Sequence, residues 1–409
     1  MFLAVGLALV LALGFVFVVQ RLSSNRHVSS LWKETLLYHT FYSPRTPVPD
    51  TEVKLFQDVK PYNFPPIRER TSTKMAMGLK RLDESNWLTL DSAYLPEHFL
   101  RCHLLCTKRS RVLQTLPGSE AACYEVLSLV VTFLSSRFPQ HFTLTTTSLG
   151  GPAIHNHLTN EIFPIGQQKC HNPLEIAAKL SMEDFNILVK NQETGEYELK
   201  ASATLFPAGW KLQERIGTSM ANLHRPVPGW KEKLGGSVNR YFRPFASPKS
   251  HQKRREGLMW NRYFDHLSPK TCMERTNLFI QTTPDLFQDS PEAVSSDEVI
   301  RPERLMVRRE RQTFMRLVNS GAVLFTVRTY ITPLVELGVE ELRALKSQVL
   351  GWEDEIRVYK GWDIWGEARM RWCDERLGGD DEKGEGNEGR ETRCEVREGI
   401  KVYLDKQKA

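Results

Sequence analysis

Alternating apolar and polar positions predict several β-strands along the chain. Residues 196–206 (EYELKASATLF) follow a polar turn (NQETGEY), and the apolar run before that turn predicts the partner strand of a hairpin. Further strands are predicted in residues 276–284 (TNLFIQTTP) and 321–334 (GAVLFTVRTYITPL), with the charged segment RRERQTF between them. A short strand is also predicted around residues 87–90.

Apolar positions spaced three or four residues apart predict helices between these strands. One helix is predicted from Pro96 onward, and a stronger one begins after Ser119, a favoured N-cap residue, and ends before Pro139. Residues 171–190 are predicted to form a helix that runs into a strand, and residues 340–355 a final helix. A chain of 409 residues, 41% of them hydrophobic, can bury a sizeable core.

The strongest apolar signal lies at the N-terminus. Residues 2–19 (FLAVGLALVLALGFVFVV) carry no charge and, at about 1.5 Å per residue, are long enough to cross a hydrocarbon core of ~30 Å. The pattern predicts one N-terminal transmembrane helix. A cleaved signal peptide is the alternative, but no basic residue precedes the run and no small-x-small cleavage site follows it.

Charge and cysteine usage predict the compartment. Arg21, Arg26 and Lys33 all follow the apolar run, so the positive-inside rule places the body of a single-pass membrane protein in the cytosol. Seven cysteines without framework spacing, and the lack of any N-x-[ST] acceptor, agree with a reducing compartment. The net charge of +6 is too small, for a chain of this length, to predict nucleic-acid binding.

Composition divides the chain into four parts. Residues 1–20 are the predicted membrane anchor, and residues 21–54 are a proline-containing extended linker. Residues 55–365 have the apolar content of a folded domain. Residues 366–409 form a polar tail, predicted to be largely disordered, because it contains too few apolar groups to build a core.

Short catalytic motifs exclude several enzyme classes. The tail contains GEGNEG, which matches G-x-G-x-x-G, but no strand is predicted before it and no helix after it, so it does not indicate a dinucleotide site. The chain lacks G-x-x-x-x-G-K-[ST], H-E-x-x-H and G-x-S-x-G. The sequence therefore gives no support for nucleotide hydrolysis, zincin chemistry or serine-hydrolase chemistry.

Two groups of histidine and cysteine residues offer soft metal ligands. The first is Cys102-His103-x-x-Cys106, and the second consists of His155, His157, Cys170 and His171. Neither has the paired spacing of a structural zinc site. Cys102 and Cys106 are i,i+4 neighbours on a predicted helix, and the favoured interpretation is that they act as small buried hydrophobes.

Residues 206–228 (FPAGWKLQERIGTSMANLHRPVP) contain the strongest single candidate, His224. Pro226 and Pro228 prevent a helix from continuing beyond this histidine, so its imidazole stands on a stiff segment and can be aimed at a ligand. The alternative is that His224 caps a short helix or packs without a chemical role.

Two arginines lie within apolar strand patterns, Arg311 in RRERQTF and Arg328 in FTVRTY. A buried guanidinium is costly unless it meets an anion. Two anions are considered: an internal carboxylate, such as Glu183, Asp184 or Glu310, and a bound ligand. The sequence does not choose between them.

Four segments in this order resemble the haem-dependent oxidative N-demethylase alpha-subunit-like family. They are MAMGLKRLDESNWLTLDSAY, HNPLEIAAKLSMEDFNILVK, LFPAGWKLQERIGTSMANLHRPVP and RRERQTFMRLVNSGAVLFTVRTYITPL, and the resemblance covers residues 55–337. It implies an α+β fold, with a PAS-like antiparallel sheet flanked by helices that holds haem b. The implied reaction uses O2 to oxidise the methyl group of a small N-methylated amine, with release of formaldehyde.

The resemblance also implies roles for single residues. The family's I-H-x-P-V-P element is similar to Leu223–Pro228, with leucine in place of isoleucine, which makes His224 the expected axial ligand of the haem iron. Arg311 and Arg328 occupy family positions, and the resemblance implies that they contact the haem propionates or the substrate. If His224 is not the ligand, the candidates are His155, His157 and His171.

Three functions remain open at this stage. The favoured one is a membrane-anchored haem oxidase whose electrons come from a partner reductase, a flavin or iron–sulfur protein, because no segment of this chain encodes a reductase. The second is a non-catalytic haem-binding PAS-type sensor. The third is an interaction scaffold without haem.

Overall fold

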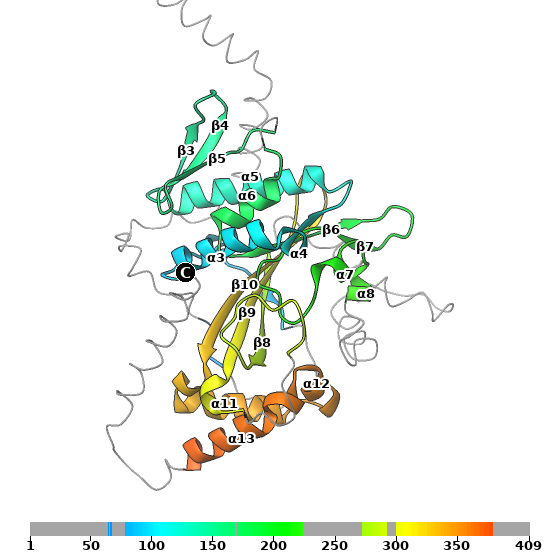
Figure 1. Ribbon diagram of the computed structural model, residues 1–409. Coiled ribbons are helices and arrows are strands. Elements are labelled where there is room, and N and C mark those ends of the chain that lie inside the picture. Colours follow the sequence, from blue (N-terminus) through cyan, green and yellow to red (C-terminus); the bar gives the residue numbers. More distant parts are fainter. Residues whose placement is uncertain are drawn as a thin grey trace, which may run out of the picture.

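Figure 1 shows a computed structural model of the chain, which describes residues 64, 66–67, 78–167, 170–223, 272–292 and 300–378. Within these ranges the centre of the fold is an antiparallel sheet of seven strands in the order β1-β8-β9-β10-β6-β7-β2. The strands are β1 (Lys80–Arg81), β2 (Leu113–Thr115), β6 (Asp184–Lys190), β7 (Tyr197–Ala203), β8 (Met273–Gln281), β9 (Met306–Arg316) and β10 (Val323–Pro333).

The predicted hairpin is confirmed as β6 and β7, and a second, longer hairpin joins β9 to β10. The first turn closes through the backbone bond from the amide of Asn191 to the carbonyl of Glu196 (2.8 Å), and Gly195 supplies the positive φ (71°) that the turn needs. The segment RRERQTF forms β9, whose two neighbours in the sheet are β8 and β10. Because β9 is buried on both faces, its charged side chains need partners inside the fold.

Helices and a second, smaller sheet cover one end of the main sheet, as Figure 1 shows. The helices are α3 (Tyr94–Thr107), α4 (Arg109–Val112), α5 (Glu120–Arg137) and α6 (Pro173–Leu180), and the small sheet contains β3 (Phe142–Thr146), β4 (Pro152–Asn156) and β5 (Glu161–Pro164). The main apolar core lies between these elements and one face of the main sheet, which we call the first face and to which Met315 and Leu324 belong. In α5 the buried residues are not confined to one stripe, as expected of a helix packed on several sides.

The opposite end of the main sheet has its own core, against α11 (Val339–Leu350), α12 (Asp354–Tyr359) and α13 (Trp362–Gly378). The helix predicted at residues 340–355 is confirmed as α11, but it ends at Leu350, five residues earlier than predicted. It is also not the last described helix, because α12 and α13 follow it. Helix α13 continues through residues that the sequence placed in the polar tail, and Arg369 and Cys373 are fully buried there. Residues 379–409 lie outside the described part.

The strand predicted around residues 87–90 is wrong. A 3-10 turn at Glu84–Asn86 precedes this segment, and the side chain of Asp83 caps that turn by accepting a hydrogen bond from the Ser85 amide (3.1 Å). The amide of Thr89 then donates to the Glu183 carboxylate (2.9 Å) instead of to a neighbouring strand. Trp87, Leu88 and Leu90 are buried because they pack into the main apolar core from an irregular segment, and not because they alternate across a sheet.

No helix within the described ranges is long and apolar enough to cross a membrane. The predicted anchor, residues 2–19, lies outside those ranges, so it stays a prediction. The described elements form an α+β fold with an antiparallel sheet flanked by helices, as the sequence predicted.

Candidate functional site

The second face of the main sheet carries an apolar cluster that we call the aromatic face. Its centre is Phe314 of β9 opposite Phe325 of β10, with ring centroids 4.8 Å apart and an interplanar angle of 29°. Buried residues from β6, β7, β10, α7 (Leu212–Arg215) and α8 (Met220–Leu223) complete the cluster. Phe325 and Trp210 are only partly buried, so part of this apolar surface remains accessible.

The chain that leads to His224 is fixed on the aromatic face. Arg215 lies over the Trp210 ring, 5.4 Å from its centroid, and its guanidinium donates a hydrogen bond to the carbonyl of Leu223. The Leu223 side chain packs against the same cluster. His224 follows directly in the sequence and lies outside the described residues, so its ligand role stays a prediction. The structure does describe the preceding residue, Leu223, which lies on this apolar, aromatic surface.

Polar side chains continue the same face of the sheet beyond the two phenylalanines. Glu310 accepts hydrogen bonds from Arg308 (3.1 Å) and Gln312 (3.0 Å), and Arg275 lies directly opposite Gln312 on β8. The Nε of Arg275 is buried and makes no hydrogen bond within the described part of the chain. Burial lowers the pKa of Arg275, while the Glu310 carboxylate acts in the opposite direction. Arg275 is thus a guanidinium with spare donor capacity next to the aromatic face.

The two arginines singled out from the sequence lie on the other face, beneath α3. Arg328 is paired with the carboxylates of Glu97 (2.9 Å) and Asp91 (3.0 Å), and Arg311 with that of Glu274 (2.8 Å). Both guanidinium side chains are only 2% exposed. Their carboxylate partners differ from the three candidates named from the sequence: Asp184 pairs with Arg101, Glu310 pairs with Arg308, and Glu183 accepts from Thr89.

The charges under α3 do not balance pair by pair, because Arg328 faces two carboxylates. Burial raises the pKa of Glu97 to about 7, although Arg328 and Arg101 act to lower it. Burial lowers the pKa of Arg328, but its carboxylate neighbours outweigh burial and the net pKa is raised. Arg328 is therefore shared between two buried carboxylates, and Glu97, with its raised pKa, exchanges a proton near neutral pH. This group is enclosed in the core, so we interpret it as structural.

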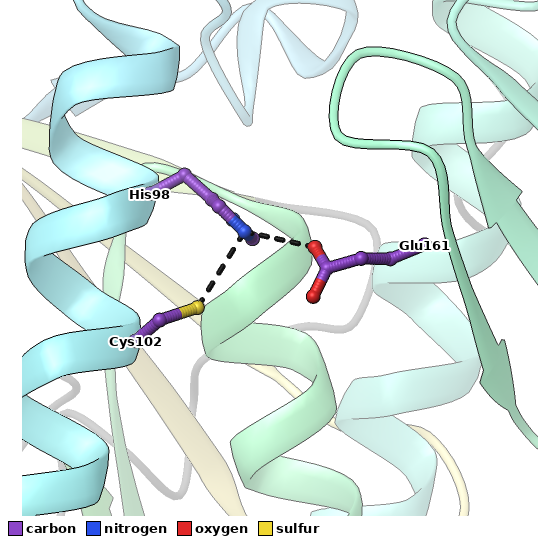
Figure 2. A group of neighbouring side chains, drawn as sticks. All are labelled: His98, Cys102 and Glu161. Carbon is purple, nitrogen blue, oxygen red and sulfur yellow. Dashed lines mark hydrogen bonds and ion pairs between the residues drawn. The ribbon is translucent and has the colours of Figure 1, made fainter.

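A third arrangement brings together His98 and Cys102 of α3 and Glu161 of β5, as Figure 2 shows. The Nε2 of His98 lies 2.8 Å from a carboxylate oxygen of Glu161 and 3.5 Å from the Cys102 sulfur. On its other side the ring meets the carbonyl of Lys179 through Nδ1 (3.0 Å). Burial raises the pKa of the Cys102 thiol, and the Glu161 carboxylate adds to that effect. These three donor atoms converge within 4.8 Å of one another.

Neither metal-ligand group suggested by the sequence comes together as a whole, and of their members only Cys102 joins a ligand cluster among the described residues. Cys106 is exposed, contrary to the buried position expected for it, and it belongs to no ligand cluster among the described residues. His155 and His157 have ring centroids 4.0 Å apart at the small sheet, where they contact Asn160 and Thr143. His171 is exposed.

Sequence reasoning missed His98, Glu161 and Arg275. His98 precedes Cys102 by one helical turn, a spacing that the sequence does show, but its carboxylate partner is 63 residues away and depends on how the small sheet packs. Arg275 lies one position outside the strand segment that the alternation pattern marked, residues 276–284.

A protein-family model matches most of the described part of the chain. Its description is "Haem-dependent oxidative N-demethylase, alpha subunit-like", and it matches residues 78–255 and 251–370. The match includes the aromatic face, the buried arginines and His224.

Proposed function

The chain belongs to the haem-dependent oxidative N-demethylase, alpha subunit-like family, and we propose that it is an oxidase that removes the methyl group of a small N-methylated amine with O2 at a bound haem b. The observation that carries this proposal is the aromatic face, an apolar surface that leads directly to His224. A porphyrin needs an apolar wall, an axial imidazole and cations for its two propionates. The described residues fit the first of these needs and offer one cation, Arg275, for a propionate.

In this proposal the aromatic face is the haem wall. The side chains of Phe314 and Phe325 present a flat, stacked surface, and Trp210 with Leu223 borders it. Such a wall excludes water and lowers the local dielectric constant, which strengthens electrostatic interactions at the site. Haem, when bound, supplies the activation of O2, and His224 is proposed as its axial ligand.

Arg275 is the described cation best placed to receive a propionate. It lies on the same face of the sheet as Phe314, and its Nε has no hydrogen-bond partner within the described ranges. Arg311 and Arg328 were also predicted to bind haem or substrate, and this stays a prediction. Each of them already has a carboxylate partner on the opposite face, so contact with haem would require that pair to open.

Electrons are proposed to come from a partner reductase, a flavin or iron–sulfur protein, because none of the chain's motifs indicates a flavin or nicotinamide site. Residues 2–19 are proposed to anchor the protein in a membrane, with the catalytic body in the cytosol. We also propose that the antiparallel main sheet is of the PAS-like type that the resemblance implies.

The absorption spectrum of the purified chain after haem supplementation tests the cofactor. We expect a Soret band that His224→Ala removes or shifts, and that Arg275→Met weakens by lowering haem affinity. A chain without a Soret band would leave only the scaffold function. If His224→Ala leaves the spectrum unchanged, the axial ligand is another histidine.

Turnover is tested separately, by formaldehyde release from several methylated amines with NADPH and a reconstituted reductase. A haem-loaded chain that releases no formaldehyde from any of them would favour the sensor function over the oxidase.

A further inference from the structure

A second cluster of potential metal ligands lies apart from the aromatic face and consists of His98, Cys102 and Glu161. They come from α3 and from the small sheet, and Figure 2 shows their donor groups turned toward one another. We propose that this cluster binds a divalent transition-metal ion of the zinc class, through the His98 Nε2, the Cys102 sulfur and the Glu161 carboxylate. This inference does not rest on the proposed haem chemistry.

The arrangement around the imidazole argues against a proton relay. A Cys-His-Glu relay needs the thiol and the carboxylate on different ring nitrogens. Here both approach Nε2, while Nδ1 faces the Lys179 carbonyl. An Nε2 atom has one proton or one lone pair, so it serves only one of the two neighbours. A metal ion at the point of convergence serves all three groups.

The second side of the imidazole is arranged as metal-binding histidines require. A backbone carbonyl at Nδ1 fixes the tautomer that leaves the Nε2 lone pair free for the ion. The contact from Nδ1 to the Lys179 carbonyl is 3.0 Å, and the Tyr94 ring stacks on the imidazole with centroids 5.9 Å apart. The His98 side chain is 4% exposed, so its orientation is set by packing.

The distances match a tetrahedral ion with little movement. Zinc bonds of about 2.0–2.1 Å to nitrogen and about 2.3 Å to sulfur place these two ligand atoms roughly 3.5 Å apart. The distance from the His98 Nε2 to the Cys102 sulfur is 3.5 Å. The distance to the Glu161 oxygen is 2.8 Å and must lengthen by about 0.5 Å, which is feasible because that side chain is 37% exposed.

The Glu161 carboxylate lacks a complete set of partners. Its buried Oε2 lies 2.8 Å from the His98 Nε2, a contact that is an ion pair only when the imidazole is protonated, and it accepts no hydrogen bond from the described residues. Buried carboxylate oxygens are usually satisfied by a hydrogen bond or a cation. A bound metal ion supplies that cation when the imidazole is neutral.

The donor set selects the class of ion. Imidazole and thiolate favour zinc over magnesium or calcium, which prefer oxygen ligands. The described residues supply three ligands, so the fourth tetrahedral position falls to water or to an added small ligand. Because α3 packs on the main sheet and β5 belongs to the small sheet, the ion ties the two together.

Zinc titration of the full-length, tag-free chain tests the site, with a chromophoric chelator as competitor after metal removal. We expect about one zinc ion per chain, and an affinity at least roughly 100-fold weaker in Cys102→Ser and in Glu161→Gln. Cys106→Ser is the matched control, because this exposed thiol lies one turn further along α3 and outside the cluster. Its zinc affinity should equal that of the unmodified chain.

Thiol alkylation of the unmodified chain gives a second readout that needs no variant. Zinc should slow alkylation of Cys102 several-fold and leave Cys106 unaffected, as followed by peptide mass spectrometry. The proposal is overturned if zinc binding does not saturate, if Cys106→Ser weakens it as much as Cys102→Ser, or if zinc leaves the alkylation of Cys102 unchanged. Neither readout involves haem or turnover, so its failure is distinguishable from failure of the proposed function.

Discussion

Replacing Arg328 with methionine tests whether this residue stabilises the core or binds a ligand. The substitution leaves the carboxylates of Asp91 and Glu97 facing each other inside the protein, where they are 2% and 9% exposed. Removing one partner of a buried ion pair costs about 3–5 kcal/mol of unfolding free energy, because the remaining charge loses its counterion. We therefore expect Arg328→Met to destabilise the chain by about this amount.

Urea unfolding measures the effect, with Arg343→Met as a matched control. Arg343 pairs with Glu340 on the surface of α11, where the two side chains are 45% and 88% exposed, and such pairs contribute at most about 1 kcal/mol. A second comparison adds Asp91→Asn and Glu97→Gln to Arg328→Met. If the cost comes from uncompensated carboxylates, the triple variant should regain at least half of the lost stability.

Two results would refute this reasoning. The first is an Arg328→Met variant that is destabilised no more than Arg343→Met. The second is a triple variant that is less stable than Arg328→Met, because it would show that the carboxylates do not oppose each other. A fall in haem affinity without a fall in stability would instead support the predicted ligand role of Arg328.

Three further predictions concern other parts of the fold. Burial raises the pKa of Glu97 in the folded protein to about 7, from 4.5 for a free glutamate, so the protonated side chain contributes roughly 3 kcal/mol at most to the unfolding free energy. This contribution is complete below pH 4.5 and is lost as the pH rises through 7. Urea titrations at several pH values should show this slope, and Glu97→Gln should lack it. Phe314→Ala should lower the unfolding free energy by about 3–5 kcal/mol, because this side chain is only 5% exposed. Phe325→Ala should lower it less, because its side chain is only partly buried. Equal losses of unfolding free energy in denaturant titrations of the two variants would contradict this prediction. Glu125→Gln should lower the unfolding free energy by about 1–3 kcal/mol, because the Glu125 carboxylate accepts hydrogen bonds from the amides of Asn319 and Ser320 in the β9–β10 turn. An unchanged melting temperature would show that these hydrogen bonds do not stabilise the fold.

The local pattern of the sequence predicted most of the elements correctly. The hairpin of β6 and β7, the helix α5 and the strand β10 lie where periodicity placed them, because a regular element imposes its own spacing on the residues that face the core. Strand β8 begins and ends three residues before the predicted segment. The pattern failed at residues 87–90, where apolar side chains are buried from an irregular segment. There the backbone is held by a carboxylate 94 residues away.

The sequence also determined the family, since four ordered segments resemble it, and a family model matches residues 78–255 and 251–370. What only the tertiary structure decided is which charged and polar groups meet. The sequence showed that Arg328 needs an anion, but Glu97 lies 231 residues away, and only the packing of α3 on the sheet makes it the partner. In the same way His98 and Cys102 are neighbours by helical spacing, whereas Glu161 joins them through the position of the small sheet. Periodicity is a local property of the chain, while pairing between distant residues depends on how the elements pack, and this is why the candidate metal ligands could not be found from spacing alone.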